Sequence, residues 1–97
     1  MDGSAIKALR ARLNLTQAQL AQLLGVHPIT VSRWENNDPQ HRPTAYQIGM
    51  MQSFETAADK DNEIPKILVG ILITAGVIAA VALLLTAAFK SVTKSSA

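Results

Sequence analysis

The sequence predicts an all-α protein in which a bundle of short helices is followed by a single C-terminal transmembrane helix. Apolar residues recur at helical spacing through residues 1–55. Residues 15–36, which read LTQAQLAQLLGVHPITVSRWEN, fit two short helices joined by a tight turn. The last third of the chain contains 23 consecutive uncharged residues, from Ile67 to Phe89. These observations divide the chain into a helical domain at 1–55, a polar linker at 56–65, a transmembrane helix at 66–90 and a short polar tail at 91–97.

The first two helices are predicted from their apolar spacing and their end signals. The first spans residues 4–13, and its inward stripe consists of Ile6, Leu9 and Leu13. The second spans residues 16–24 and opens with a capping-box pattern, because Thr16 is followed three residues later by Gln19. It ends before Gly25, a residue type that adopts left-handed backbone geometry without steric cost.

The third helix is predicted at residues 28–36, with His27 at its cap and Pro28 in its first turn, where a missing N–H does no harm. Its spacing makes Trp34 a core anchor. The sequence Asn-Asn-Asp-Pro at residues 36–39 then indicates a turn. A fourth helix at 44–55 is expected to close the core with Tyr46, Ile48, Met51 and Phe54.

Composition limits the possible functions. The net charge is +2, from nine basic and seven acidic side chains, so DNA affinity would depend on where the charges lie. There is no cysteine, which excludes disulfides and thiolate metal sites. No catalytic triad, phosphate-binding glycine loop or metal-ligand spacing is present, so we expect no enzyme, cofactor or metal. Asp59, Asp61 and Glu63 fit a solvated linker better than a cation site, because a calcium loop needs further ligands and a glycine in register.

The run TQAQLAQLLGV, followed by VSRWEN, resembles the helix-turn-helix of the lambda repressor, Cro and xenobiotic-response-element family of phage and bacterial regulators. The resemblance extends from about Ile6 to about Met51 and combines several motifs in register. It implies a repressor-like bundle of four or five helices that binds double-stranded DNA. Residues 28–36 would form the recognition helix in the major groove. Because family members usually dimerise, a homodimer or higher homo-oligomer is expected.

Family position implies four residues that point at base edges: Pro28, Ile29, Ser32 and Arg33. Arg33 is the strongest candidate, because its planar guanidinium can donate two hydrogen bonds to guanine. The alternatives for Arg33 are a phosphate contact and a solvated surface position. Ile29 can touch a thymine methyl group, Ser32 specifies weakly, and Pro28 offers only apolar contact.

Three further residues are candidate phosphate contacts: Gln17, Asn36 and Arg42. Gln17 occupies a family position that bonds a phosphate at a helix N-terminus, and the other two flank the predicted turn. The resemblance also implies a partly buried ion pair between Arg10 and Glu35, which joins the first helix to the end of the recognition helix. Removing one partner of such a pair leaves a costly uncompensated charge.

The uncharged run at residues 67–89 is bracketed by Lys66 and Lys90. It is long enough to span a bilayer, whose core of about 30 Å needs about 20 helical residues. A buried core helix is the alternative, but a small bundle cannot surround a helix that is apolar on every side. The two sides of the predicted span carry equal numbers of lysines, so charge does not set its orientation in the membrane. The short tail is easier to translocate than the folded domain. We therefore expect an inner-membrane protein with its N-terminal domain in the cytoplasm, and Gly76 and Ala80 permit close contact between two such spans.

Three functions remain open. The leading hypothesis is a membrane-anchored, sequence-specific transcriptional regulator whose lipid-embedded span pairs two DNA-binding domains. The second is a membrane-tethered protein-interaction module. It is favoured by the near-neutral charge and by the resemblance of this layout to bacterial cell-shape proteins of the RodZ type. The third is a small phage membrane or structural protein, suggested only by the composition of the linker, span and tail.

Overall fold

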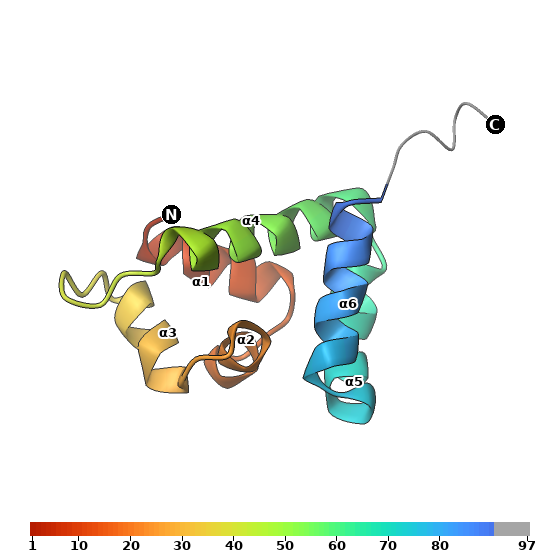
Figure 1. The fold of residues 1–97 in the computed structure, drawn as a ribbon, viewed down its shortest axis with the longest axis horizontal. Helices are drawn as coiled ribbons and strands as arrows, with labels where there is room; N and C mark the ends of the chain where they lie inside the picture. Colours follow the sequence, from red (N-terminus) through yellow and green to blue (C-terminus); the bar gives the residue numbers. More distant parts are fainter. Residues whose placement is uncertain (91–97) are drawn as a thin grey trace.

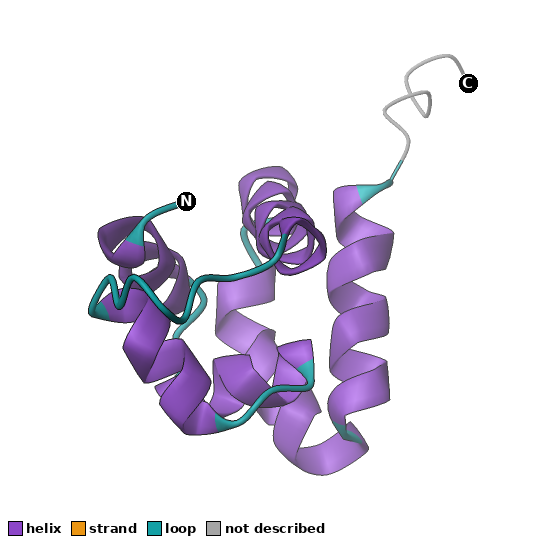
Figure 2. Cartoon of the chain, turned by 60° about the vertical axis from the view of Figure 1, so that its left-hand side comes forward, coloured by secondary structure: helices purple, strands orange, loops and turns teal. Residues whose placement is uncertain are grey.

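The computed structural model describes residues 1–90, and all regular secondary structure within them is helical (Figures 1 and 2). Figure 1 shows α3 at one end of the molecule and the paired helices α5 and α6 at the other, with α4 running between the two ends. The all-α class is thus confirmed, whereas the predicted tail at 91–97 lies outside the described residues. The helices are α1 (Gly3–Arg12), α2 (Gln17–Leu24), α3 (Pro28–Glu35), α4 (Ala45–Lys60), α5 (Ile64–Ala75) and α6 (Val77–Ala88).

The predicted end signals of α2 and α3 are present. The Gln19 backbone N–H donates to Thr16 Oγ1 at 3.1 Å, and Gln19 Oε1 accepts from the Thr16 N–H at 2.9 Å, which completes the capping box. Gly25 ends α2 with φ of 68°. His27 caps α3 through Nδ1, which accepts from the backbone N–H of Ile29 at 3.2 Å. These contacts satisfy backbone N–H groups that have no partner within their helices.

One continuous core joins all six helices. In the helix-turn-helix part, Trp34 is 3% exposed and therefore is the core anchor that its spacing predicts. Residues of the C-terminal helices belong to the same cluster and do not form a second core. The largest fully buried side chains are Phe54, Ile6, Leu9, Leu13, Leu20, Met51, Ile64, Leu68, Leu84 and Val31.

The start of α1 lies directly against the end of α3. The Gly3 backbone N–H donates to Asn37 Oδ1 at 2.8 Å, and Asn37 itself has φ of 56°. A Cβ atom at Gly3 would lie 2.3 Å from the main-chain oxygen of Glu35, which is shorter than any tolerable contact. Only a glycine therefore permits α1 to approach the end of α3 this closely.

We expect Gly3→Ala to lower the free energy of unfolding by about 1–3 kcal/mol, because the new methyl group must push apart two backbone segments. Gly49→Ala is the matched control. Gly49 lies within α4 with open space around its Cβ position, so alanine there should raise stability by up to about 1 kcal/mol. Urea unfolding of both variants measures the difference. Equal midpoints for the two variants would contradict the close approach.

The helix α4 differs from its prediction in two ways. It continues to Lys60 and includes Ala57 and Ala58, both buried, so residues 56–60 of the expected linker are helical. Alanine favours a helix and lets a neighbouring helix approach closely, which explains the extension. The prediction that Tyr46 closes the core is wrong. Tyr46 follows the Thr44 cap in the first turn of α4, and its side chain is 74% exposed.

The expected single transmembrane helix at residues 66–90 is not present. The uncharged run instead forms two helices of 12 residues each, α5 and α6, which lie side by side as a hairpin. The break is at Gly76, whose φ of 96° and ψ of 178° cannot continue a helix. A helix of 12 residues is about 18 Å long, against a bilayer core of about 30 Å. No helix within residues 1–90 is long and apolar enough to cross a membrane.

The prediction assumed one long helix, apolar on every side, which a small bundle could not surround. Two short helices can cover part of each other. Each helix of the hairpin buries one side against its neighbour and the bundle, and α6 packs chiefly against α4. Leu68 and Leu84, from the centre of the two helices, are fully buried. Folding the run in half therefore buries part of its apolar surface, whereas Ile73, Ile78 and Phe89 remain exposed.

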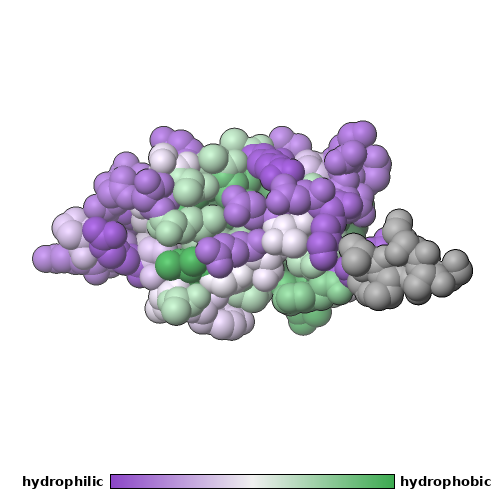
Figure 3. Space-filling model, turned by 90° about the horizontal axis from the view of Figure 1, so that it is seen from above, coloured by the Kyte–Doolittle hydropathy of each residue, from purple (hydrophilic) through white to green (hydrophobic). Residues whose placement is uncertain are grey.

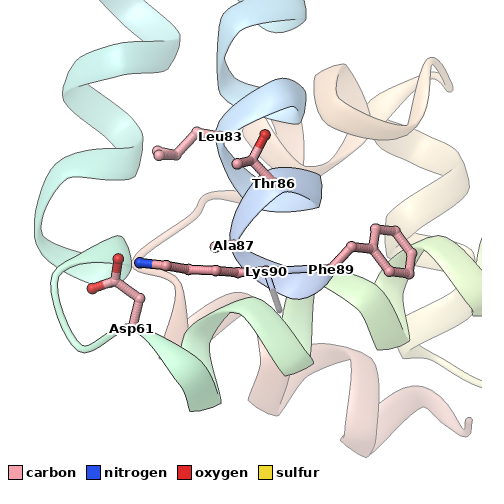
Figure 4. A pocket seen from close by; sticks show the side chains of 6 residues that line it. All are labelled: Asp61, Leu83, Thr86, Ala87, Phe89 and Lys90. Carbon is pink, nitrogen blue, oxygen red and sulfur yellow. The ribbon is translucent and has the colours of Figure 1, made fainter. Parts of the chain in front are cut away.

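Two hydrogen bonds also attach the hairpin to the bundle. Asn14, at φ of 60° after α1, donates from Nδ2 to the main-chain oxygen of Pro65 at 2.8 Å. Lys60 Nζ donates to the main-chain oxygen of Ala88 at 2.8 Å, which satisfies a carbonyl at the end of α6. Beside this end is a shallow hollow in which Figure 4 shows the Lys90 side chain extending toward Asp61. The hollow is otherwise lined by Leu83, Thr86, Ala87 and Phe89.

Candidate nucleic-acid interface

The two sides of α3 differ in burial. Val31 and Trp34 are buried in the core. On the other side Arg33 is exposed and Ile29 is 50% exposed. Of the remaining predicted base-contacting residues, Pro28 is exposed and Ser32 is half-buried. The structure therefore places these four residues on the accessible part of α3, at one end of the molecule (Figure 1).

An ion pair fixes the end of α3 to α1. Arg10 Nε donates to Glu35 Oε2 at 2.8 Å, and Arg10 Nη2 donates to Glu35 Oε1 at 3.1 Å. Arg10 Nη1 also donates to the main-chain oxygen of Leu15 at 3.2 Å, so the guanidinium joins three segments. The Glu35 side chain is 2% exposed and that of Arg10 22%. The two-bond geometry orients α3 rotationally as well as holding it in place.

The environment of Glu35 keeps its carboxylate charged. Burial alone would raise its pKa, but hydrogen bonds from Arg10 and Gln17, with the nearby charges of Arg10 and Lys7, hold the pKa below its ordinary value of 4.5. A carboxyl group whose pKa is lowered by folding stabilises the native state at pH above its ordinary pKa. That stabilisation is lost as the pH falls from about 4.5 through the lowered value.

Gln17, predicted as a phosphate contact, also takes part in this network. Its Nε2 donates to Glu35 Oε1 at 3.0 Å, so the amide is part of the network that holds α3. Gln17 is also the first residue of α2, where backbone N–H groups lack partners within the helix. A phosphate at this position would therefore meet the helix N-terminus directly, while the side chain continues to bind Glu35.

The loop after α3 brings a carboxylate next to the recognition surface. The Asp38 backbone N–H donates to the Arg33 main-chain oxygen at 3.0 Å. Hydrogen bonds from the Gln40 N–H and the His41 ring, together with the charges of His41 and Arg33, hold the pKa of Asp38 below its ordinary 3.8. Sequence reasoning treated Asp38 only as a turn residue. Its position near Arg33 follows from how the turn folds back, which spacing alone does not reveal.

The two remaining candidate phosphate contacts flank this loop. Asn36 is the C-cap residue of α3 and is exposed, and Arg42 is exposed before the start of α4. Arg33 and Asn36 thus lie at the end of α3, and Arg42 adds a second positive charge on the loop that leads to α4. The bound carboxylate of Asp38 offsets part of that charge, which agrees with the low net charge of the whole chain.

Comparison with known families finds a similarity in this region. Residues 6–47 match the model of the helix-turn-helix family that contains lambda repressor and Cro-like domains. These residues are therefore similar to a helix-turn-helix domain. The match includes most of α1, all of α2 and α3, and the start of α4, which are the elements that build the surface described above. No curated protein and no solved structure matches the chain. The α5–α6 hairpin lies outside the matched residues.

Proposed function

We propose that the protein is a sequence-specific DNA-binding transcriptional regulator that inserts α3 into the major groove of double-stranded DNA. One observation carries the proposal: α3 of a helix-turn-helix domain has its inner side fixed by Trp34 and Glu35 while its outer side exposes Ile29 and Arg33. A recognition helix must be rigidly held and accessible at the same time, because a misplaced guanidinium loses the two-bond geometry that reads guanine.

In this proposal some accessible residues contact bases and others contact phosphates. Arg33 donates to the O6 and N7 atoms of a guanine, and Ile29 contacts a thymine methyl group. Asn36, Arg42 and the N-terminus of α2 at Gln17 contact phosphates, which set the register on the duplex without specifying sequence. The low net charge predicts weak non-specific binding, so specific contacts carry an unusually large share of the affinity.

A protein-interaction module remains the second candidate, because the domain is nearly neutral and Asp38 lies beside Arg33. The layout that suggested a cell-shape protein has lost its support, since it required a single span after the helix-turn-helix. The two functions differ in what Arg33 does. If the protein reads DNA, removing the Arg33 guanidinium should weaken specific DNA binding. If it is a protein-interaction module, there is no specific DNA binding for that change to weaken.

The test begins with selection of bound sequences from a random pool of duplexes at fixed salt, followed by electrophoretic shifts on the enriched sequence. We expect Arg33→Ala to weaken specific binding about 10- to 100-fold, as one bidentate guanine contact is worth about 1–3 kcal/mol. Arg12→Ala is the control, because it removes the same charge from α1, where Arg12 pairs with the exposed Asp59. If no sequence is enriched, or if both variants lose affinity equally, the proposal fails.

A further inference from the structure

A histidine and an aspartate are paired in the loop that joins α3 to α4, residues 36–44. His41 Nδ1 lies 2.9 Å from Asp38 Oδ2, and the His41 backbone N–H donates to the Asp38 main-chain oxygen at 3.1 Å. Asp38 is itself tied to α3, because its backbone N–H donates to the Arg33 main-chain oxygen at 3.0 Å. Hydrogen bonds therefore connect the imidazole, through Asp38, to the end of α3.

The pair determines which ring nitrogen of His41 carries a proton. The Asp38 carboxylate is charged at neutral pH, because hydrogen bonds and neighbouring positive charges hold its pKa below the ordinary 3.8. A charged carboxylate only accepts hydrogen bonds, so Nδ1 of the ring must be the donor. In the neutral ring Nε2 is then an acceptor, whereas in the charged ring Nε2 also carries a proton and donates. The His41 side chain is 41% exposed, and no group within residues 1–90 forms a hydrogen bond with Nε2.

We propose that His41 contacts a DNA phosphate only when its ring is charged, so that binding of double-stranded DNA takes up a proton. The inference rests on the proposed function and deepens it. A phosphate oxygen only accepts hydrogen bonds, so it is repelled by the Nε2 lone pair of the neutral ring and is bound by the N–H of the charged ring. The Asp38 carboxylate next to Nδ1 also favours the charged ring.

The position of the loop suits a phosphate contact. Hydrophilic atoms dominate the end of the molecule that carries it (Figure 3). The same loop contains Asn36 and Arg42, which are exposed and are the phosphate contacts of the proposed function. His41 directly precedes Arg42, so the charged ring would add a third donor to this part of the surface. Because phosphates are present at every base pair, the proton uptake should not depend on the base sequence of the duplex.

Few other groups around the loop change charge near neutral pH. Among ordinary side chains only histidine does so between about pH 5 and 8, together with the terminal amino group. His27, at the cap of α3, acts in the opposite direction, because its Nδ1 accepts from the Ile29 N–H at 3.2 Å and a proton on that atom removes the cap. On α2 there is no charged residue, and on α4 there is none before Glu55. The remaining charged or titratable groups of α1, α3, the loop and the start of α4 near this end are the terminal amino group, Asp2, Lys7, Arg10, Arg33, Glu35, Arg42 and Tyr46.

The test measures the affinity of the full chain for its selected duplex by fluorescence anisotropy at pH 6 and pH 8, with the ionic strength fixed. We expect the natural protein to bind about 5- to 10-fold more tightly at pH 6, because one charge-assisted hydrogen bond to a phosphate is gained. His41→Gln should lose this difference. His41→Arg stays charged, so it should bind at pH 8 about as tightly as the natural protein binds at pH 6.

The matched control is His27→Asn, which replaces the other histidine by a residue that caps a helix without titrating. This variant should retain the full difference between pH 6 and pH 8. Salt provides a second readout, because each phosphate contact adds about 0.9 to the slope of log affinity against log salt concentration. The slope of the natural protein should therefore be steeper at pH 6 than at pH 8 by about that amount, whereas His41→Gln should show one slope at both.

A measurement without DNA tests the pair itself. In the natural protein at pH 8, the nitrogen chemical shifts of the His41 ring should show the proton on Nδ1; a proton on Nε2 overturns the inference. A chain that selects a sequence but binds it equally tightly at pH 6 and pH 8 also overturns it, as does His41→Gln retaining the full difference, and both leave the proposed function standing. A chain that binds no duplex at either pH overturns both.

Discussion

Replacing Glu35 with alanine is expected to lower the free energy of unfolding by about 2–3 kcal/mol. The carboxylate accepts hydrogen bonds from Arg10 and Gln17 in a site where its side chain is 2% exposed. Removing it leaves the Arg10 guanidinium partly buried without its counter-charge, which costs more than the intact pair contributes. Because Arg10 retains some solvent contact, the effect should stay below that of a fully buried pair. Urea unfolding at pH 7 measures it.

The exposed ion pair between Arg12 and Asp59 provides the control, because both side chains are largely in solvent. Asp59→Ala should change stability by less than about 1 kcal/mol. The pH gives a second readout. Stability of the natural protein should fall as pH drops from about 4.5 through the lowered pKa of Glu35, and Glu35→Gln should flatten that part of the profile. If Glu35→Ala and Asp59→Ala are equally mild, the network does not hold α3 in the way described.

Ending the chain after Lys60 is expected to abolish cooperative folding. The hairpin supplies Ile64, Leu68 and Leu84, all fully buried, to the core that α4 shares with the helix-turn-helix. Burying each such side chain contributes about 1.5–3 kcal/mol, whereas whole domains are stable by only about 5–15 kcal/mol. The fragment should show a broad thermal transition and reduced helical circular dichroism. This differs from the sequence-based division, in which residues 1–55 form a complete domain.

Single substitutions in the full chain measure how much the hairpin contributes to stability. Leu84→Ala should cost about 2–5 kcal/mol, because a fully buried leucine leaves a cavity between α6 and α4. Ala82→Ser, on the exposed side of the same helix, should be nearly neutral. A fragment of residues 1–60 that unfolds cooperatively at the midpoint of the full chain would show that the hairpin is dispensable for the fold.

The helix-turn-helix could be predicted from the sequence because its signals are local. Thr16, Gln19 and Gly25 act within a few residues of themselves, so their order in the chain contains the information needed. The inward position of Trp34 followed from helical spacing in the same way. Tyr46 shows the limit of this reasoning, since an amphipathic aromatic residue in a first turn fits either side of a helix.

The hairpin could not be predicted from hydropathy. A run of 23 uncharged residues is compatible with one long helix across a bilayer or with two short helices against a bundle. What separates the two outcomes here is the conformation of Gly76 and the presence of a receptive surface on α4, including Ala57 and Ala58. The conformation of Gly76 cannot be read from the sequence, because transmembrane helices also contain single glycines. The second depends on tertiary packing across many residues of chain.

The sequence predicted which residues of the candidate site are exposed, but it did not predict the contacts that these residues make with their neighbours. Helical spacing and family position gave the outward direction of Ile29 and Arg33, which the structure shows as exposed. The amide of Gln17 binds Glu35 because α2 packs against α3, and Asp38 lies beside Arg33 because the loop after α3 turns back toward that helix. Such contacts join residues that are distant in sequence or lie across a turn, and no periodic pattern encodes them.

The central claim, that Arg33 reads a guanine in the major groove, is tested most directly by a double-substitution cycle on the selected DNA sequence. Each guanine is replaced in turn by 7-deazaguanine, which lacks the N7 acceptor, and affinity is measured for the natural protein and Arg33→Ala. We predict that one replacement per half-site weakens the natural protein about tenfold and leaves Arg33→Ala unaffected. If every replacement weakens both proteins by the same factor, Arg33 does not contact a base and the account is contradicted.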